Sequence, residues 1–432
     1  MSMESTGSAH TAGIADEPPD SGFVGLSGLP GELLIDPESL AAAADDFGHI
    51  VHRIPAAVLR PGSAADVAHA LRFAARAGIP ARARGAGHAT HGGAQVQGGL
   101  VIDMTALRRV HAVAGDRVTV DAGALWSHVL AATLPLGLTP PVLTDYLEIT
   151  VGGTLSAGGL GGTSHRHGAQ TDHVLSLDVA TPGGTVTRCG PESNRELFDA
   201  VRAGHGDHGI IVSATVRLIP APAFARRCKL VYPDLHTLAA DQRRLIAEGP
   251  FDFVQGQVIP TLEGWGYLLE AVAYHASGRR PDDAALLDGL HHLPGAPGEE
   301  FEDLAYGEFL HRMASGAAFL RDTGEWHHPH PWLNVFIPGS VAADLTADIL
   351  ADFTTDDLGQ SGVILFYPVN TTHIKTPNLA LPAEPEAFLL SLLRTSPPED
   401  LEAVNTALTQ NQAIHNKITA TGGTLYPIGT RF

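Results

Sequence analysis

Two glycine-rich segments hold the residues whose types and spacing best suit the binding of an anion. The first is Arg84-Gly85-Ala86-Gly87-His88, inside the longer stretch RARGAGHATHGGAQ at 82–95. Glycine adopts positive φ and lets backbone N–H groups approach an anion closely. This segment lacks the GxGxxG spacing and the helix start of a dinucleotide-binding loop. Taken alone, it is better explained as a surface loop.

The second segment is VGGTLSAGGLGGTSHRHG at 151–168, in which six of the eleven residues from 152 to 162 are glycine. Each glycine costs a helix or strand roughly 0.5–1 kcal/mol relative to alanine. The composition therefore predicts neither a good helix nor a good strand, but a backbone that closely approaches something flat or anionic. Two such segments in one domain favour a large phosphorylated cofactor.

Histidine and cysteine offer no comparable pattern. The chain has 23 histidines, including those of WHHPHPW at 326–332 and the pair His165 and His167. No carboxylate or cysteine set completes a zinc site at recognisable spacing, so we predict solvated or hydrogen-bonding histidines and no metal. The two cysteines, Cys189 and Cys228, form neither a CxxC pair nor a disulfide framework.

The elements that position these segments alternate unevenly between strand and helix up to about residue 222. Ser63, Asp66 and Gly78 predict a capped helix over 64–77, and Pro182-Gly183-Gly184 predicts the turn of a hairpin over 174–189. The uneven alternation indicates an α+β fold rather than a regular doubly wound sheet. Further strands are predicted at 56–59, in VIDM and VTVDAG, and in GIIVSATVRLI; further helices are predicted in LWSHVLAATL and NRELFDAVRAG.

A chain of 432 residues is expected to form two or three domains. Residues 1–25 lack hydrophobic periodicity and are predicted to be a disordered leader. From about 223 to 400, strand candidates such as FVQGQVI and YLLEAVAYHA alternate with Ala/Leu-rich helices. The final segment, 411–432, is predicted to form a helix, a glycine turn and a short strand-like run.

Composition excludes several classes of function. A net charge of −20 would repel a nucleic acid backbone, whereas a small or neutral substrate is compatible with it. The longest apolar runs fall short of the roughly 18 residues that a membrane span requires. Arg53 is the first basic residue, so a basic signal-peptide region and a twin-arginine signal are missing. We therefore predict a cytoplasmic protein without a nucleic acid or membrane partner.

Several motifs in collinear order resemble those of the cytokinin dehydrogenases, which are vanillyl-alcohol-oxidase-like, PCMH-type flavoproteins. The resemblance extends from about residue 45 to 430. It implies a PCMH-type FAD-binding domain of two α/β subdomains at 26–222, an α+β substrate cap at 223–400, and a return to the FAD domain at 401–432. The motifs are RGAGHATHGGAQVQGGLVIDM, TDYLEITVGGTLSAGGLGGTSHRHGAQTDHV, NRELFDAVRAGHGDHGIIVSATVRLIPAP, YGEFLHRM, HPHPWLNVFIPGS and ILFYPVN.

The resemblance also implies how FAD is held. In the family, the histidine of RGxGHS is covalently bonded to the flavin, and His88 stands at that position. Ala89 replaces the usual serine and Gly93 the usual glutamine, while His91 lies three residues past the matching position. No cysteine lies near 147–153 to form a second covalent bond. The other residues implied to contact FAD are Arg84, Gly85, Ala86, Gly87, Ala89, Thr150, Ser156, Leu160, Ile211 and Tyr426.

Asp145 matches the catalytic aspartate of the family, although Leu143 replaces the preceding tryptophan. Oxidation of a C–N bond needs a carboxylate that accepts the proton of the substrate nitrogen. The alternative for Asp145 is a cap on the following turn. Trp332 and Asn334 are implied to lie over the substrate cavity, with core packing as their alternative.

The implied activity is that of a bacterial-type, FAD-linked oxidoreductase. It would cleave the side chain of an N6-substituted adenine through an imine, giving adenine and an aldehyde, with oxygen or a quinone as electron acceptor. Two alternatives remain: oxidation of another amine, alcohol or secondary metabolite, and a flavin-binding remnant without turnover. The second alternative rests on the end at Phe432, where the family continues through W…HFG…W to a PGQ motif. We expect a less shielded flavin there. ILFYPVNTTHI also lacks the tryptophan-bearing continuation of plant members.

Overall fold

The computed structural model describes residues 23–26, 28–262 and 264–429. Of the predicted disordered leader, residues 1–22 lie outside the described residues. Phe23 is buried against Phe73, with ring centroids 6.0 Å apart, and a 3₁₀ turn follows at Val24–Leu26. The last residues of the predicted leader are therefore folded, because an aromatic pair attaches them to the first domain.

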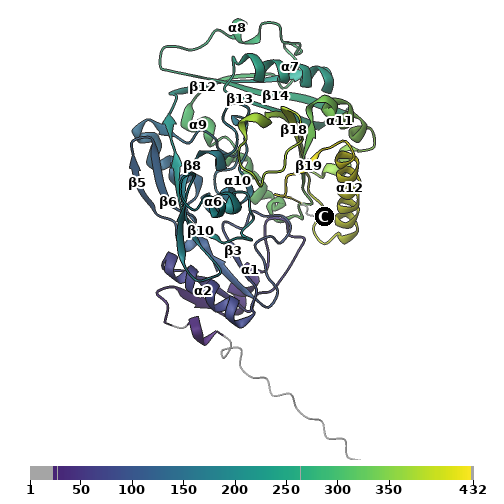
Figure 1. The fold of residues 1–432 in the computed structure, drawn as a ribbon. Helices are drawn as coiled ribbons and strands as arrows, with labels where there is room; N and C mark the ends of the chain where they lie inside the picture. Colours follow the sequence, from purple (N-terminus) through teal and green to yellow (C-terminus); the bar gives the residue numbers. More distant parts are fainter. Residues whose placement is uncertain (1–22, 27, 263, 430–432) are drawn as a thin grey trace, which may run out of the picture.

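A small sheet and two helices form one end of the molecule (Figure 1). The sheet has the order β1-β2-β4-β3, in which β2, β4 and β3 are parallel and β1 is antiparallel to β2. Its elements are β1 (Glu32–Leu34), α1 (Pro37–Ala43), β2 (Ala57–Arg60), α2 (Ala64–Ala77), β3 (Ala81–Arg84) and β4 (Leu100–Asp103).

Helix α2 confirms its predicted caps. The Ser63 hydroxyl accepts a hydrogen bond from the Asp66 amide, and Gly78 ends the helix with a φ of +67°. The Asp66 carboxylate also accepts the amides of Gly31 and Gly62 at 2.9 and 2.8 Å. The N-terminus of α2 is thereby attached to the loop after β2 and to the residues before β1.

A second, antiparallel sheet has the order β5-β6-β10-β8-β9. The predicted hairpin is its β8–β9 pair, with Leu177 opposite Cys189. The elements are β5 (Val110–Ala114), β6 (Arg117–Asp121), α3 (Trp126–Thr133), β7 (Leu138–Thr139), α4 (Val151–Ala157), α5 (Ser164–His167), β8 (Val174–Ala180), β9 (Val186–Cys189), α6 (Arg195–Val201), β10 (Ile210–Arg217) and β11 (Ile219–Pro220), of which β7 pairs with β11.

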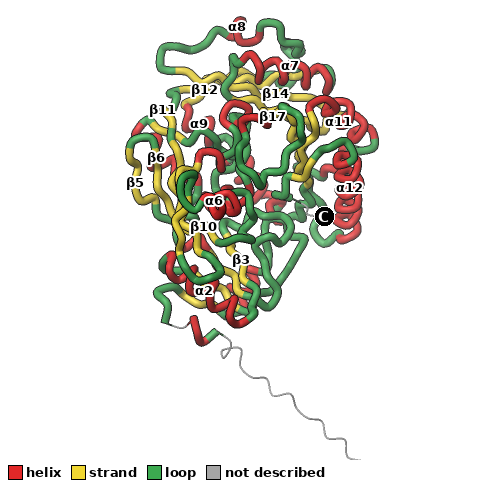
Figure 2. Tube along the Cα trace, in the orientation of Figure 1, coloured by secondary structure: helices red, strands yellow, loops and turns green. Residues whose placement is uncertain are grey.

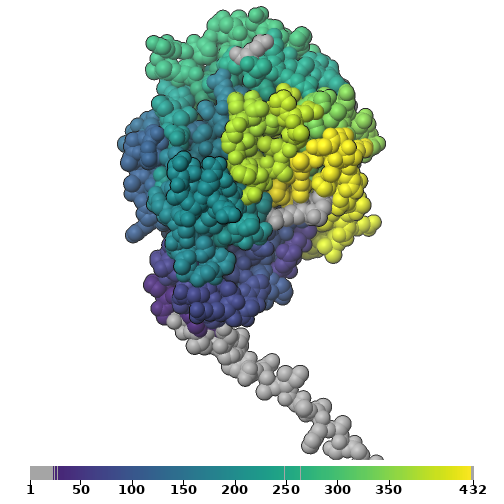
Figure 3. Space-filling view, in the orientation of Figure 1, coloured from purple at the N-terminus to yellow at the C-terminus, as the bar shows by residue number. Residues whose placement is uncertain are grey.

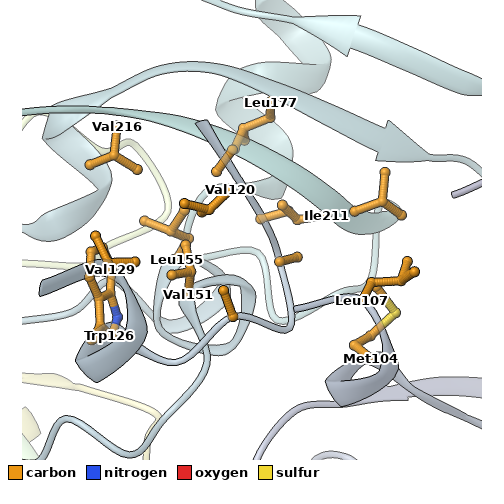
Figure 4. Packing of buried hydrophobic residues seen from close by; sticks show 14 of the residues in the cluster. Met104, Leu107, Val120, Trp126, Val129, Val151, Leu155, Leu177, Ile211 and Val216 are labelled. Carbon is orange, nitrogen blue, oxygen red and sulfur yellow. The ribbon is translucent and has the colours of Figure 1, made fainter. Parts of the chain in front are cut away.

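The second glycine-rich segment departs from its prediction, because α4 and α5 make much of it helical. A Cβ on Gly152 would lie 2.7 Å from the Ala122 Cβ, so glycine allows the helix to pack directly on the residues after β6. Val151 and Leu155 of α4 point into the core beside Trp126 and Val120 (Figure 4). Burial of this apolar side outweighs the low helix propensity of glycine.

An antiparallel sheet of eight strands forms the cap, in the order β15-β12-β14-β13-β17-β18-β16-β19. Helices α7, α11 and α12 lie on its outer side (Figure 2). The elements are β12 (Phe224–Tyr232), α7 (Leu235–Glu248), β13 (Phe253–Thr261), β14 (Gly264–His275), α8 (Asp283–Leu287), β15 (Glu300–Ala305), α9 (Tyr306–Leu310), α10 (Ala314–Thr323), β16 (Leu333–Pro338), α11 (Ala342–Ala351), β17 (Val363–Asn370), β18 (Glu386–Leu393), α12 (Leu401–Thr419) and β19 (Thr424–Leu425).

The C-terminal segment packs first on the cap and only then reaches the FAD-binding part. Strand β19 pairs with β16, placing Leu425 opposite Val335, and α12 contacts the same strand. In Figure 3 these C-terminal residues form the yellow surface beside the yellow-green residues that precede them. The division at residue 400 stays a prediction, while residues 401–425 associate with the cap sheet. Within the described residues, no helix is both long and apolar enough to cross a membrane.

Candidate active site

The two glycine-rich segments meet around one large pocket of about 540 Å³. Its wall comes from the loop after β3, from α4, from the turn before β10 and from the segment after β19. Most of the predicted cofactor-binding residues line this pocket, whereas Arg84, Leu160 and Asn334 lie outside its lining. The predicted residues in the lining are Gly85, Ala86, Gly87, His88, Ala89, Thr150, Ser156, Ile211, Trp332 and Tyr426.

The first glycine loop turns its carbonyls toward residues 45–48 and leaves amides free. The carbonyls of Gly87 and Ala89 accept the amides of Phe47 and Gly48 at 2.8 and 3.1 Å. The amides of Ala86, Gly87 and His88 donate no hydrogen bond to any described residue. Because buried or partly buried N–H groups need an acceptor, this loop is suited to an anionic ligand.

Arg84 supports this loop from behind. Its guanidinium donates to the Asp45 carbonyl at 2.6 Å and lies so close to Gly87 that a Cβ there would be 2.5 Å from Nη2. Gly87 has a φ of +74°, which side-chain-bearing residues rarely adopt. Arg84 therefore shapes the loop and does not itself line the pocket.

Asp46 fixes the other end of the loop. Its carboxylate accepts the amides of Gly92 and Gly48 at 2.7 and 3.0 Å. Burial raises the pKa of Asp46 to about 6, although the two amides act in the opposite direction. The sequence offered little sign of this role, since Asp46 belongs to no glycine motif and merely stands at the start of the region of similarity.

The His88 ring lies in an aromatic cluster at the pocket. Its centroid is 4.2 Å from that of Phe47 and 5.0 Å from that of Tyr146, both in stacked arrangements. Trp326 and Trp332 lie at 6.0 and 6.1 Å. Burial, and to a smaller degree the charge of Arg321, lowers the pKa of His88 to about 4. The imidazole is therefore neutral near pH 7, and its ring nitrogens make no hydrogen bond to a described residue.

Helix α4 meets the first loop through Thr150 and Gly85. A Cβ on Gly85 would lie 2.2 Å from the Thr150 hydroxyl, which caps α4 by accepting the Gly153 amide at 3.2 Å. The amides of Val151 and Gly152 already donate to Ala124 and Ala122. Of these two segments, it is thus the first loop that offers open amides to the pocket, whereas the first amides of α4 are already engaged in packing.

Tyr426 connects the C-terminal segment to this wall. Its buried hydroxyl accepts the Gly159 amide at 3.2 Å, and its amide donates to the Asn334 carbonyl at 2.9 Å. Burial raises the pKa of this phenol, so it stays protonated. Leu160 belongs to the same buried cluster as Tyr426, the buried Asn334 is its backbone partner, and Trp332 reaches the pocket from the cap.

Asp145 lies beside the large pocket rather than in its lining. Its Oδ1 accepts from Arg312 Nη2 at 2.5 Å and its Oδ2 from Gln255 Nε2 at 2.8 Å. No main-chain N–H of the described residues donates to it, so it does not cap the following turn. Its neighbours in sequence face the site, since Thr144 lines the pocket and Tyr146 stacks on His88.

Two family models match this protein. One, described as an FAD binding domain, matches residues 55–190. The other, described as cytokinin dehydrogenase 1, FAD and cytokinin binding, matches residues 263–425. An uncharacterized oxidoreductase of the fasciation locus of Rhodococcoides fascians is 43% identical, over 91% of this chain and 89% of that protein. Cytokinin dehydrogenase 1 of Oryza sativa subsp. japonica is 37% identical over 88% and 81%. Cytokinin dehydrogenase 2 of Arabidopsis thaliana is 34% identical over 86% and 81%.

The chain belongs to the cytokinin dehydrogenase family. It is an FAD-dependent oxidoreductase with a PCMH-type FAD-binding domain and a cap domain. This confirms the predicted α+β fold class and the family resemblance.

The pocket of this cytokinin dehydrogenase family member suits FAD on its own geometry. A volume of about 540 Å³ lies in the range of cofactor sites. The open amides of the first loop suit a pyrophosphate. Glycines at 85, 87 and 159 let the wall pack closely on Thr150, Arg84 and Gln170, which a Cβ at these positions would meet. Among the described residues, no group of three His, Cys, Asp or Glu side chains could hold a metal ion, and both cysteines are buried and free.

Proposed function

We propose that this protein is a cytokinin dehydrogenase that oxidises the C–N bond between N6 of a substituted adenine and its substituent, with Asp145 as the base. The observation that carries the proposal is that both neighbours of Asp145 in the sequence belong to the site. Thr144 lines the pocket, and Tyr146 stacks on His88 at 5.0 Å. The family membership and the cytokinin dehydrogenase relatives support the same substrate class.

Each part of the site has its own role in this proposal. Gly85 to Ala89, Thr150, Ser156, Ile211 and Tyr426 would hold FAD, with Arg84 and Leu160 behind them and His88 as the covalent anchor. When bound, FAD supplies a hydride acceptor for the substrate carbon. Asp145 accepts the proton of the substrate N–H, which leaves an imine that water cleaves to adenine and an aldehyde. Trp332 borders the substrate space, with Asn334 buried next to Tyr426, and a small molecule, oxygen or a quinone, takes up the electrons.

The carboxylate of Asp145 is the part of this proposal that a single substitution tests. Asp145→Asn keeps the shape of the side chain but removes the proton acceptor. Loss of a general base typically lowers a rate by about 10²–10⁴-fold. We expect flavin reduction by isopentenyladenine, followed by stopped-flow bleaching at saturating substrate, to slow by that factor while the FAD content hardly changes.

Asp172→Asn is a matched control, because Asp172 accepts the Ala169 and Lys375 amides at 2.8 and 3.0 Å, away from the pocket lining. It should reduce at the parental rate. If the flavin of Asp145→Asn is reduced as fast as that of the parent, Asp145 is not the base of this reaction. A parent protein whose flavin is not reduced by isopentenyladenine would contradict the substrate class.

A further inference from the structure

Asp145 is the inner end of a row of alternating charges that runs through the cap. Arg312 donates to Asp145 through Nη2 at 2.5 Å and faces Glu270 Oε1 through Nε at 3.4 Å. Glu270 accepts from Arg227 at 2.5 Å, and Arg227 also donates to Glu302 at 2.7 Å. The row begins at Glu302, a half-exposed carboxylate, and passes through the largely buried side chains of Arg227, Glu270 and Arg312. It ends at the partly exposed Asp145.

Arg312 has little freedom to leave this row. Its side chain is only 9% exposed, and that of Glu270 only 6%. The guanidinium lies over the rings of Phe253 and Phe309, with its carbon 4.8 and 4.5 Å from their centroids. An arginine stacked on aromatic rings and bonded at both ends keeps a fixed orientation.

Among the described residues, Arg312 is the cation in contact with Asp145. Gln255 contributes a neutral amide donor to Oδ2. Burial raises the pKa of the nearby Tyr367 phenol well above its usual value, and the charge of Asp145 adds to this, so Tyr367 stays neutral. Burial lowers the pKa of Arg312, but Asp145 and Glu270 together outweigh it and the net shift is upward. Tyr274, also buried and protonated, faces the same guanidinium.

We propose that Arg312 is a positioning residue that keeps Asp145 a carboxylate in the resting enzyme, and that Glu270 retains Arg312 when Asp145 takes up the substrate proton. Each oxygen of Asp145 accepts one hydrogen bond and keeps a second lone pair for the substrate proton. As the proton arrives, Arg312 loses an ionic partner at Nη2 and keeps the one facing Nε. This inference rests on the role of Asp145 in the proposed function.

The test compares Arg312→Met and Arg312→Lys over pH 5 to 9, with isopentenyladenine as substrate. An adjacent cation lowers the pKa of a carboxyl by about 1–3 units. In Arg312→Met, the acid limb of the flavin reduction rate should therefore move up by about 1–3 pH units, and Arg312→Lys should restore most of it. Glu270→Gln should move the limb in the opposite direction, because it removes a competing anion. Arg226→Met is the matched control, since Arg226 is an equally buried arginine of the cap bonded to Asp283.

A second measurement needs no substrate. Infrared difference spectra on acidification should show the carboxylic C=O band of Asp145, assigned by its loss in Asp145→Asn. The band should appear at higher pH in Arg312→Met than in the parent protein. A parent that isopentenyladenine does not reduce would refute the proposed function, and the infrared comparison would still decide the role of Arg312. The inference would be overturned if folded Arg312→Met and Glu270→Gln variants kept the acid limb of the reduction rate and the carboxylic C=O band at the pH values of the parent. If Arg312→Met does not fold, Glu270→Gln decides alone.

Discussion

The neutral imidazole of His88, packed among aromatic rings, is the side chain that most clearly characterises this site. His88 has its ring against Phe47 and Tyr146, and its pKa is lowered to about 4. A neutral ring nitrogen with no hydrogen bond to a described residue keeps its lone pair available as a nucleophile. We therefore predict that FAD is bonded to His88. After acid precipitation of the pure protein, the yellow colour should stay in the pellet.

His88→Ala should release that colour into the supernatant while the protein still folds, since His88 makes ring contacts but no hydrogen bond to a described residue. His91→Ala is the matched control, because it removes the other histidine of the same loop. It should leave the colour in the pellet. Colour retained by His88→Ala and lost by His91→Ala would move the linkage to His91.

The residues around the pocket show which parts of a site a sequence can predict. Gly85 to His88 and Thr150 lie in the lining because their roles depend on backbone shape, which local motifs specify. Asp46 belonged to no motif. Arg312 lies in YGEFLHRM and Gln255 in the strand candidate FVQGQVI, but neither pattern indicated that these side chains meet Asp145. Arg312 meets Asp145 across 167 residues and Gln255 across 110, and such pairing depends on how the cap packs on the first domain.

At the scale of elements, local signals predicted local structure. The helix capped by Ser63 and the hairpin turning at 182–184 need only neighbouring residues. The order of the eight cap strands depends on non-local pairing, as in β16 between β18 and β19, which no periodicity encodes. Helix α4 was missed because tertiary packing overrode the propensity of its glycines.

Glycine in α4 and glycine in α10 should therefore respond oppositely to alanine. Alanine favours a helix by about 0.8–1 kcal/mol over glycine. At Gly152, however, the added Cβ would lie 2.7 Å from the Ala122 Cβ and 3.0 Å from its carbonyl oxygen, and overpacking costs typically about 1–3 kcal/mol. We predict that Gly152→Ala lowers the melting temperature and the ratio of FAD to protein.

Gly316→Ala provides the matched helical control, because a Cβ there meets nothing within 4 Å. It should raise the melting temperature slightly and leave the FAD ratio unchanged. If Gly152→Ala were as stable and as fully loaded as Gly316→Ala, α4 would not be held against the residues after β6 in the way that the contacts indicate.

At the scale of the whole molecule, the FAD-binding part and the cap meet at one pocket, and buried histidines connect the two parts. The His330 ring of the cap donates a hydrogen bond to the Phe47 carbonyl at 2.8 Å. The His165 ring donates a hydrogen bond to the Gly162 carbonyl at 2.9 Å. The His165 carbonyl in turn accepts a hydrogen bond from the ring of His373 in the cap. Burial is the main cause that lowers the pKa of His330 to about 3 and that of His165 to about 4, so both are neutral in the folded protein.

Neutral buried histidines should make the fold sensitive to acid. An unfolded histidine binds its proton near pH 6.5, whereas these bind theirs only near pH 3 to 4. Between pH 6.5 and 4 the unfolded state therefore binds more protons than the folded state. The free energy of unfolding falls over that window as the pH is lowered. At about 1.36 kcal/mol per pH unit, each group loses about 3 kcal/mol of this stability between pH 6.5 and pH 4.

The comparison of His330→Asn with the parent isolates one of these groups. Acidification also reduces the net charge of −20 and protonates carboxylates, but those effects are common to both proteins and cancel in the difference. The asparagine amide can still donate to the Phe47 carbonyl, and it has no proton to take up. We predict that the melting temperature of His330→Asn falls less steeply than that of the parent between pH 6.5 and 4, whereas the exposed-site control His128→Asn follows the parent. Parallel curves for His330→Asn and the parent would mean that His330 does not stay neutral through this range in the folded protein.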